Sequence, residues 1–284
     1  MAIDTSNEAQ RAYWNDVAGP KWVALDALIN DQIEALGLEA IRHAAPRAGE
    51  AVLDVGCGCG HSSFELARRV GRTGSVLGAD VSKPMLARAR SQAGAFSQLA
   101  FEVADAQTHA FAPEAFDLVF SRFGVMFFED PEVAFANLLT ALRPGGRFVF
   151  VCWQAIGANP WMAIPAAAAL QHLDLPAPPD PLAPGPFAFA DRERVASMLA
   201  GAGFEAVAHR AHEAEVTVGR GLSPDQVLEF LVQMGPAGAA MREAPPEVQE
   251  RIRASVAEAV APLLGDEGMV AAAATWMVEA RRPG

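Results

Sequence analysis

The stretch VLDVGCGCGHSS at residues 52–63 decides the fold. The apolar residues 51–55 are predicted to form a short buried strand, and residues 61–70 a helix. The glycines between them form a tight loop, because glycine lets the backbone turn sharply and approach a ligand closely. The first amides of the helix offer hydrogen-bond donors to such a ligand. The stretch therefore predicts a ligand-binding loop between a buried parallel strand and a helix.

Strands and helices continue to alternate after this stretch. Apolar runs predict further strands at residues 75–79, 99–103, 116–121, 147–153, 204–218 and, last, within 272–280. Helical spacing and capping predict helices across much of 1–50 and at 84–93, 132–142, 191–202, 223–234 and 245–263. Proline and alanine are too frequent between 155 and 187 for a long regular helix. Such an alternation implies a parallel sheet with helices on both faces.

Composition restricts the class of protein. The 284 residues are 51% hydrophobic, which indicates a globular chain with a sizeable core. A net charge of −12 repels phosphate backbones and argues against a nucleic-acid partner. The chain has no apolar run long enough for membrane insertion and no recognisable signal peptide, and its three cysteines are too few and odd for a disulfide framework. We therefore expect a cytoplasmic protein.

The glycine loop itself discriminates between nucleotide ligands. A dinucleotide site has the spacing G-x-G-x-x-G and a Walker loop contains G-K-[ST], whereas this loop is G-x-G-x-G without a lysine. Asp54, two residues before Gly56, would repel a pyrophosphate and suits a cationic partner such as an amino group. The alternative is a tight strand-to-helix connection that binds nothing.

Acidic residues end the next two predicted strands. Asp80 lies about 20 residues after the glycines, where a ribose diol is usually held, although a helix cap would also explain it. Val81 and Met85 follow and could pack against an adenine face; ordinary helix packing explains Met85 equally well. Asp105 could accept a hydrogen bond from an adenine amino group, and the Ala106 amide could donate to a ring nitrogen. All lie at the carboxyl edge of the predicted sheet, where open α/β sheets bind ligands.

Five segments, in this order, resemble class I S-adenosylmethionine-dependent methyltransferases of the ubiquinone/menaquinone-biosynthesis-like, small-molecule type. They are LDVGCGCG at 53–60, GADVS at 78–82, VADAQ at 103–107, FDLVFSRFGVMFFEDP at 116–131 and LRPGGRF at 142–148. The resemblance implies S-adenosyl-L-methionine as the cofactor. It also implies a Rossmann-like three-layer α/β sandwich, with a seven-stranded, mostly parallel sheet whose last strand is antiparallel and lies next to the last parallel one. The strand predicted within 272–280 fits that place.

The resemblance assigns cofactor-binding roles to individual residues. Gly56, Cys57 and Gly58 would contact the methionine part, and Asp54 would orient the loop, whose Gly60 is also a cofactor-binding residue. Asp80 would bind the ribose, and Asp105 and Ala106 the adenine. Ser121 and Arg122 would lie near the amino group and the sulfonium. Helices that cover the cofactor are common in this class. The aromatic rings of Tyr13, Trp14 and Trp22 therefore either face the sulfonium or simply pack their helices on the sheet.

No general base stands out. The candidates are Tyr13, His61, His172, Glu129 and Asp130. A helix start explains His61, a solvated surface position explains His172, and a helix N-terminus explains Glu129 and Asp130. A base is not required, because the sulfonium is an activated leaving group and in-line positioning can supply much of the rate. We also find no acidic cluster or set of separated cysteines that suggests a metal.

The expected domain organisation places a lid over the transferred methyl group. It consists of covering helices at 1–45, a cofactor-binding core at 46–155, a variable lid segment at 156–190, a continuation of the core at 191–218, a helical lid insertion at 219–268 and a closing strand at 269–284. Both lid segments start from the carboxyl edge and exceed the usual loop length. The expected substrate contacts are Phe123, Trp153, Trp161 and Phe230. The core of a helical subdomain or a homodimer interface would explain the same apolar residues.

The sequence thus predicts a methyltransferase that moves a methyl group by in-line displacement to a small hydrophobic or aromatic metabolite. Two alternatives are a SAM-binding enzyme with non-methylation chemistry and a non-catalytic SAM-binding scaffold. A nicotinamide dehydrogenase is a third. The identity of the acceptor, the atom that is methylated and the oligomeric state stay open.

Overall fold

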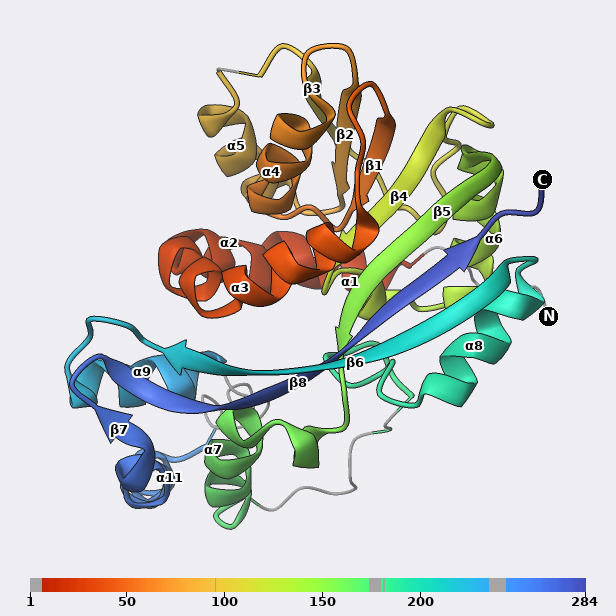
Figure 1. Cartoon of the computed structure of the whole chain (residues 1–284). Coiled ribbons are helices and arrows are strands. Elements are labelled where there is room, and N and C mark those ends of the chain that lie inside the picture. Colours follow the sequence, from red (N-terminus) through yellow and green to blue (C-terminus); the bar gives the residue numbers. More distant parts are fainter. Residues whose placement is uncertain (1–6, 95, 174–179, 181, 235–243) are drawn as a thin grey trace.

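The computed structural model describes residues 7–94, 96–173, 180, 182–234 and 244–284 (Figure 1). The strands are β1 (Ala51–Val55), β2 (Ser75–Asp80), β3 (Leu99–Val103), β4 (Phe116–Arg122), β5 (Leu142–Trp153), β6 (Glu205–Val218), β7 (Leu264–Gly265) and β8 (Gly268–Arg281). The α-helices are α1 (Glu8–Ala12), α2 (Ala18–Ala24), α3 (Asp26–Ala44), α4 (His61–Val70), α5 (Lys83–Gln92), α6 (Pro131–Ala141), α7 (Pro160–Leu170), α8 (Arg192–Gly201), α9 (Pro224–Met234) and α11 (Pro246–Val260). The shorter helical segments are a π-helical turn, η1 (Tyr13–Val17), and the 3₁₀ turns η2 (Val125–Phe127), η3 (Ile156–Ala158) and η4 (Ala261–Leu263).

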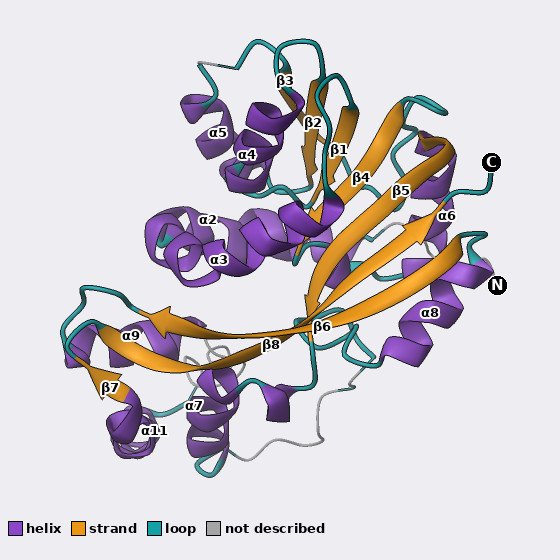
Figure 2. Cartoon of the chain, viewed as in Figure 1, coloured by secondary structure: helices purple, strands orange, loops and turns teal. Residues whose placement is uncertain are grey.

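One sheet runs through the molecule in the order β3-β2-β1-β4-β5-β8-β6 (Figure 2). The strands from β3 to β5 pair in parallel, and β8 lies antiparallel between β5 and β6. The short β7 lies off this path and pairs with β8. The mostly parallel sheet with an antiparallel closing strand beside the last parallel strand is therefore confirmed.

Helices cover both faces of the sheet. The Arg147 side chain in β5 donates a hydrogen bond to the carbonyl of Ala44 in α3, at 2.9 Å. The next residue, Phe148, packs against Phe135 of α6, with ring centroids 5.7 Å apart. Because successive side chains of a strand point to opposite faces, α3 and α6 lie on opposite faces of the sheet.

Local signals in the sequence account for the boundaries of α6 and α8. Asp191 caps α8, because its carboxylate accepts hydrogen bonds from the amides of Glu193 and Arg194 at 2.9 and 3.2 Å. Gly203 follows that helix with a φ of +98°, a conformation that favours glycine. Asp130 caps α6 in the same way, which confirms the helix start expected there.

The structure differs most from the prediction at α7 and β5. The helix α7 lies within the proline- and alanine-rich segment: Pro160 stands in its first turn, where no N–H is needed, and alanines compensate for the hydrogen bond that Pro165 removes. The strand β5 begins at Leu142, five residues before the predicted start. Main-chain hydrogen bonds between the turn at Gly145 and Gly146 and the segment around Arg282 extend the pairing there.

The β6–β8 hairpin extends beyond the rest of the sheet. Trp153, the last residue of β5, pairs with Thr275 of β8, which in turn pairs with His212 of β6. Residues 213–218 of β6 and 268–274 of β8 therefore lie beyond the carboxyl end of β5, for roughly 20 Å at about 3.3 Å per residue. Figure 1 shows α7, α9, β7 and α11 gathered around this extension, away from β1–β3.

Candidate cofactor and acceptor site

The glycine loop links β1 to α4 and touches the loop that follows β4. Gly56, Gly58 and Gly60 have φ values of +66°, +56° and +90°, which side chains rarely adopt. A Cβ on Gly56 would lie 2.8 Å from the Cα of Gly124. Positions 56 and 124 both require glycine, because the backbones of these two loops approach each other directly.

Asp54 lies below this loop with its side chain fully buried. Its Oδ2 accepts hydrogen bonds from the hydroxyls of Ser62 at 2.8 Å and Ser63 at 2.6 Å. Its Oδ1 has no partner among the described residues. Burial raises the pKa of Asp54 to about 6, although the two serines and the charge of Arg122 act in the opposite direction. A buried oxygen without a partner would be satisfied by a cationic or hydrogen-bond-donating group.

Asp80, at the end of β2, holds the glycine loop in place. Its two oxygens accept hydrogen bonds from the amides of Gly58 and Ser82, both at 2.8 Å. Burial raises the pKa of Asp80, while these amides act in the opposite direction. Each carboxylate oxygen can accept more than one hydrogen bond, so two hydroxyls can still bind here.

Asp105 follows β3 and also has an unpartnered carboxylate oxygen. Its Oδ1 accepts hydrogen bonds from the Gln107 amide at 3.0 Å and from Asn7 Nδ2 at 3.2 Å. Its Oδ2 is buried and has no partner within the described part of the chain. Burial raises the pKa of Asp105 as well. Asn137 fixes the same loop, because its Nδ2 donates to the carbonyls of Ala106 and His109 at 2.9 and 2.8 Å.

The N-terminal helices close over this edge of the sheet. Asn7 also accepts a hydrogen bond from the Glu129 amide at 3.2 Å, so it connects the loops after β3 and β4. The carbonyl of Trp14 accepts a hydrogen bond from the Ser82 hydroxyl at 2.9 Å. Sequence reasoning missed Asn7 and Asn137, because no spacing or motif distinguishes them from surface asparagines.

Other predicted cofactor residues lie around the loop. Met85 is buried, and its Cε would be 2.8 Å from a Cβ on Gly58. The carbonyl of Val81 accepts a hydrogen bond from Asn15 Nδ2 at 2.9 Å. Trp22 meets the ring of Trp14 edge to face, with centroids 5.8 Å apart. Met85 thus contacts the loop, Trp22 belongs to the covering layer, and Val81 follows β2 and contacts that layer.

Aromatic residues adjoin the loop at the end of β4. Ser121 is buried, and its hydroxyl accepts a hydrogen bond from the Gly124 amide at 3.2 Å. Phe123 has a φ of +59°, a strained conformation for a bulky residue. Its ring stacks on Trp153, with centroids 4.3 Å apart, and Trp153 meets Trp161 at 5.2 Å. The structure therefore brings three of the four predicted substrate contacts together. Phe230 is buried on α9, in the lid insertion.

The predicted base candidates lie in different environments. His61 does not cap its helix; its Nε2 lies 2.8 Å from Asp26 Oδ1 of α3. Burial alone would raise the pKa of Asp26, but hydrogen bonds from His61 and Arg88 outweigh it and hold that pKa below its ordinary value. His172 is half-buried rather than solvated, and its Nε2 has no partner in the described chain. Tyr13 is largely exposed.

The cysteines offer no thiolate. All three are free and buried. Burial raises the pKa of Cys59 to about 12 and raises the pKa values of Cys57 and Cys152 well above the ordinary range. Within the described residues, no three histidine, cysteine or carboxylate side chains are grouped to hold a metal ion. No helix in that part of the chain is long and apolar enough to cross a bilayer.

The residues fit an adenosyl amino acid with a cationic end. Two carboxylates have unpartnered buried oxygens: Asp54 lies near the end of β1, and Asp105 follows β3. Asp80 ends β2, the strand between them. The free oxygen of Asp54 suits an ammonium group and that of Asp105 an exocyclic amine, whereas Asp80 suits a ribose diol. No lysine lies in the glycine loop to bind a phosphate.

Comparisons with known proteins agree with this interpretation. Residues 52–146 match the family described as "Methyltransferase domain". The ubiquinone/menaquinone biosynthesis C-methyltransferase UbiE of Azotobacter vinelandii is 31% identical over 191 residues, which cover 63% of this chain and 75% of that protein. The chain therefore belongs to the class I S-adenosylmethionine-dependent methyltransferases, and S-adenosylmethionine is the cofactor of this class.

Other similarities concern a shorter part of the chain or the fold alone. Aklanonic acid methyltransferase DauC of Streptomyces sp. (strain C5) is 36% identical over 117 residues, covering 40% of this chain and 53% of that protein. The chain spans only 20% to 53% of the length of the first curated relatives that it matches. A solved structure of phosphoethanolamine N-methyltransferase 2 from Haemonchus contortus with S-adenosyl-L-methionine has a similar fold, with a TM-score of 0.59, 16% identity, and coverage of 96% of this chain and 60% of that one.

Proposed function

We propose that the protein transfers a methyl group from S-adenosylmethionine to a small apolar or aromatic metabolite. The observation that carries this proposal is the row of rings formed by Phe123, Trp153 and Trp161, which starts next to the glycine loop. A flat apolar acceptor can lie against such rings in a defined orientation. The names of two relatives agree with this proposal, because one is a methyltransferase of aklanonic acid and the other acts in ubiquinone and menaquinone biosynthesis.

The cofactor supplies an activated methyl group on a sulfonium. The residues of this chain would bind and orient it: Asp54 at the amino group, Asp80 at the ribose and Asp105 at the adenine amine. In-line positioning of a nucleophile against that methyl group can supply much of the rate, so the proposal requires no dedicated base. A row of aromatic rings also favours a nearby cation.

We further propose that the segments 156–190 and 219–268 form the lid over the acceptor. Two contacts support this arrangement for the segment 219–268. Lys21 Nζ of α2 donates to the carbonyl of Gln233 of α9 at 2.6 Å, and Arg220 pairs with Asp31 of α3 at 3.1 Å. The covering helices α2 and α3 are thus in contact with the segment 219–268. Residues 174–179, 181 and 235–243 of these segments lie outside the described residues.

Transfer of a labelled methyl group tests the proposal. The purified protein, incubated with methyl-labelled S-adenosylmethionine and a fractionated pool of apolar metabolites, should label at least one fraction. A Trp161→Leu variant should lose most of this transfer while keeping its affinity for S-adenosylhomocysteine. The matched control is Trp276→Leu, because the indole of Trp276 donates to the carbonyl of Ala190 on the opposite face of the sheet. Binding of S-adenosylhomocysteine without transfer to any fraction would favour a scaffold instead.

A further inference from the structure

The row of aromatic rings ends at Trp161, in the first turn of α7. The ring of Trp161 meets that of Trp153 edge to face, with centroids 5.2 Å apart, and Trp153 in turn stacks on Phe123. The indole nitrogen of Trp161 is buried, and within the described residues no group accepts a hydrogen bond from it. Because buried polar groups in folded proteins are almost always hydrogen-bonded, this N–H requires an explanation.

The indole of Trp276 shows how the same fold satisfies another tryptophan. Its N–H donates to the carbonyl of Ala190 at 3.0 Å, so a backbone oxygen is its partner. The N–H of Trp161 has no such oxygen in the described chain, although its ring packs against the hydrophobic core. An indole N–H can only donate a hydrogen bond. The group that satisfies Trp161 must therefore offer an acceptor atom.

Asn159 holds the start of α7 in place. This side chain is fully buried, and its Nδ2 donates to the carbonyls of Gln154 and Ala155, both at 3.2 Å. Its Oδ1 accepts a hydrogen bond from the Ala274 amide of β8 at 2.8 Å. These bonds tie the first turn of α7 to β8 and to the segment that follows β5. Trp161 lies two residues further on, so its indole has the rigid support that a binding group needs.

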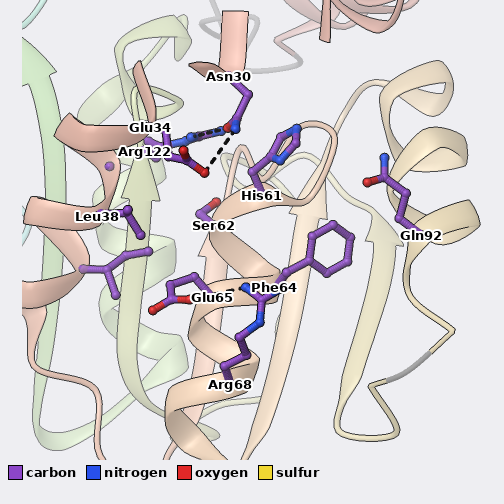
Figure 3. A pocket seen from close by; sticks show the side chains of 12 residues that line it. Asn30, Glu34, Leu38, His61, Ser62, Phe64, Glu65, Arg68, Gln92 and Arg122 are labelled. Carbon is purple, nitrogen blue, oxygen red and sulfur yellow. Dashed lines mark hydrogen bonds and ion pairs between the residues drawn. The ribbon is translucent and has the colours of Figure 1, made fainter. Parts of the chain in front are cut away.

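A cavity with a volume of about 350 Å³ lies between α3 and α4, beside the glycine loop (Figure 3). Its lining includes Arg122 of β4 and Ser62, which also donates to the buried Asp54. The stem of Arg122 fits against Gly37 of α3, where a Cβ would lie 2.5 Å from its Cδ. None of the residues that line this cavity belongs to the row of aromatic rings. The row of rings is thus a surface separate from this cavity.

The protein shields the indole nitrogen of Trp161 from solvent. The helix α7 lies in the segment 156–190, one of the two segments proposed as the lid. A partner would therefore reach the N–H while the lid is open and be enclosed with it when the lid closes. In such an enclosed site a single hydrogen bond discriminates between ligands, because a ligand without the matching atom leaves the N–H unpaired.

Resting on the proposed function, we propose that Trp161 determines which acceptors bind, because its N–H pairs with an oxygen of the acceptor. The acceptor is then an aromatic compound with a carbonyl, phenolic or enolic oxygen on or beside its ring. Phe123 and Trp153 hold the flat carbon skeleton, and the N–H of Trp161 fixes its orientation. A protonated amine offers donors alone and finds no partner in Trp161.

Calorimetric titration of the protein saturated with S-adenosylhomocysteine tests this assignment. The two probes are 1-tetralone, an aromatic ketone, and tetralin, which has the same carbon skeleton without the oxygen. Trp161→Phe keeps an aromatic ring and removes the N–H. It should weaken 1-tetralone roughly 3- to 10-fold more than tetralin, the range for one neutral hydrogen bond. Its affinity for S-adenosylhomocysteine should stay at the wild-type value, which shows that the variant is folded.

The matched control is Trp276→Phe. It removes an indole N–H that is already bonded within the protein, so it should leave the affinities for both probes unchanged. The proposal is overturned if Trp161→Phe weakens both probes by the same factor, because Trp161 would then contribute its shape alone. It is also overturned if the variant weakens neither probe.

The labelled product of the methyl-transfer experiment gives an independent test. Mass spectrometry should find an oxygen on or beside an aromatic ring of this product, in addition to any oxygen that carries the label. A labelled product without such an oxygen would contradict recognition by Trp161 and leave the proposed methyl transfer intact. If no fraction is labelled, the proposed function fails, and this inference fails with it.

Discussion

Protonation of Asp54 should make cofactor binding depend on pH. Its carboxylate has a pKa of about 6 in the free protein, and the proposed ammonium partner binds its ionised form. Lowering the pH from about 7 to about 5 converts Asp54 from mostly ionised to mostly neutral, which should weaken S-adenosylhomocysteine roughly 10-fold. The ligand does not change its own charge over this range, because an amino-acid ammonium and carboxylate both stay ionised.

Calorimetry at a series of pH values, with 5′-methylthioadenosine, which lacks the amino-acid end, in parallel, measures this effect. The nucleoside is the internal control, because Asp80 and Asp105 also have raised pKa values and would affect both ligands alike. The ratio of the two affinities should therefore report Asp54 alone. In Asp54→Asn the ratio should be low and flat with pH. A ratio that stays constant from about pH 7 to about pH 5 in the wild type would refute the reasoning.

The same shift has a consequence for the stability of the free protein. A carboxyl group whose pKa is higher in the folded state contributes stability below its ordinary pKa near 4, and this contribution is lost as the pH rises through the folded value. Two pKa units correspond to at most about 3 kcal/mol. At neutral pH the cofactor-free Asp54→Asn variant should therefore unfold at a higher temperature than the wild type, although it binds the cofactor less tightly. A lower midpoint for the variant would show that ionised Asp54 stabilises the fold.

Further substitutions test the contributions of individual residues to ligand binding and to stability. Gly124→Ala would place a Cβ 2.9 Å from the Cα of Gly56 and should weaken S-adenosylhomocysteine at least 10-fold in a binding titration, whereas Gly201→Ala, whose Cβ would meet nothing within 4 Å in the described chain, should bind normally. Asn137→Ala should weaken S-adenosylhomocysteine and 5′-methylthioadenosine by the same factor, because it loosens the adenine side; a loss confined to one ligand would contradict this. Asp191→Ala should lower the free energy of unfolding by about 1 kcal/mol in urea titrations, and Asp191→Asn, which also caps helices, should lose little.

The parts of the site that were predictable are those encoded locally. Each of Asp54, Asp80 and Asp105 ends or closely follows a strand of the same sheet, and parallel strands bring such residues to one edge whatever the rest of the chain does. The glycines at 56, 58 and 60 were predictable for a similar reason, because their backbone conformation needs only the local turn.

The parts that could not be predicted depend on contacts between distant segments. His61 turns toward Asp26, 35 residues away in the chain, instead of capping its own helix. Asn7 reaches a carboxylate 98 residues away. Arg122 follows a motif serine, and nothing in its neighbourhood reveals that its side chain lies against Gly37. The helix α7 forms because alanines and a first-turn proline tolerate Pro165, which composition alone did not suggest.

The place of β8 between β5 and β6 has a consequence for how the chain folds. β6 lies at the edge of the sheet and pairs with β8, which follows it by about 50 residues in the chain. During synthesis, β5 and the long β6 are thus both complete before β8, the strand that pairs with each of them, has been made. Exposed strand edges are templates for wrong pairing, and late, non-local pairing slows folding. Charged residues on β6, such as Glu213 and Glu215, are exposed in the folded protein. They would oppose association of β6 with other chains before it pairs with β8.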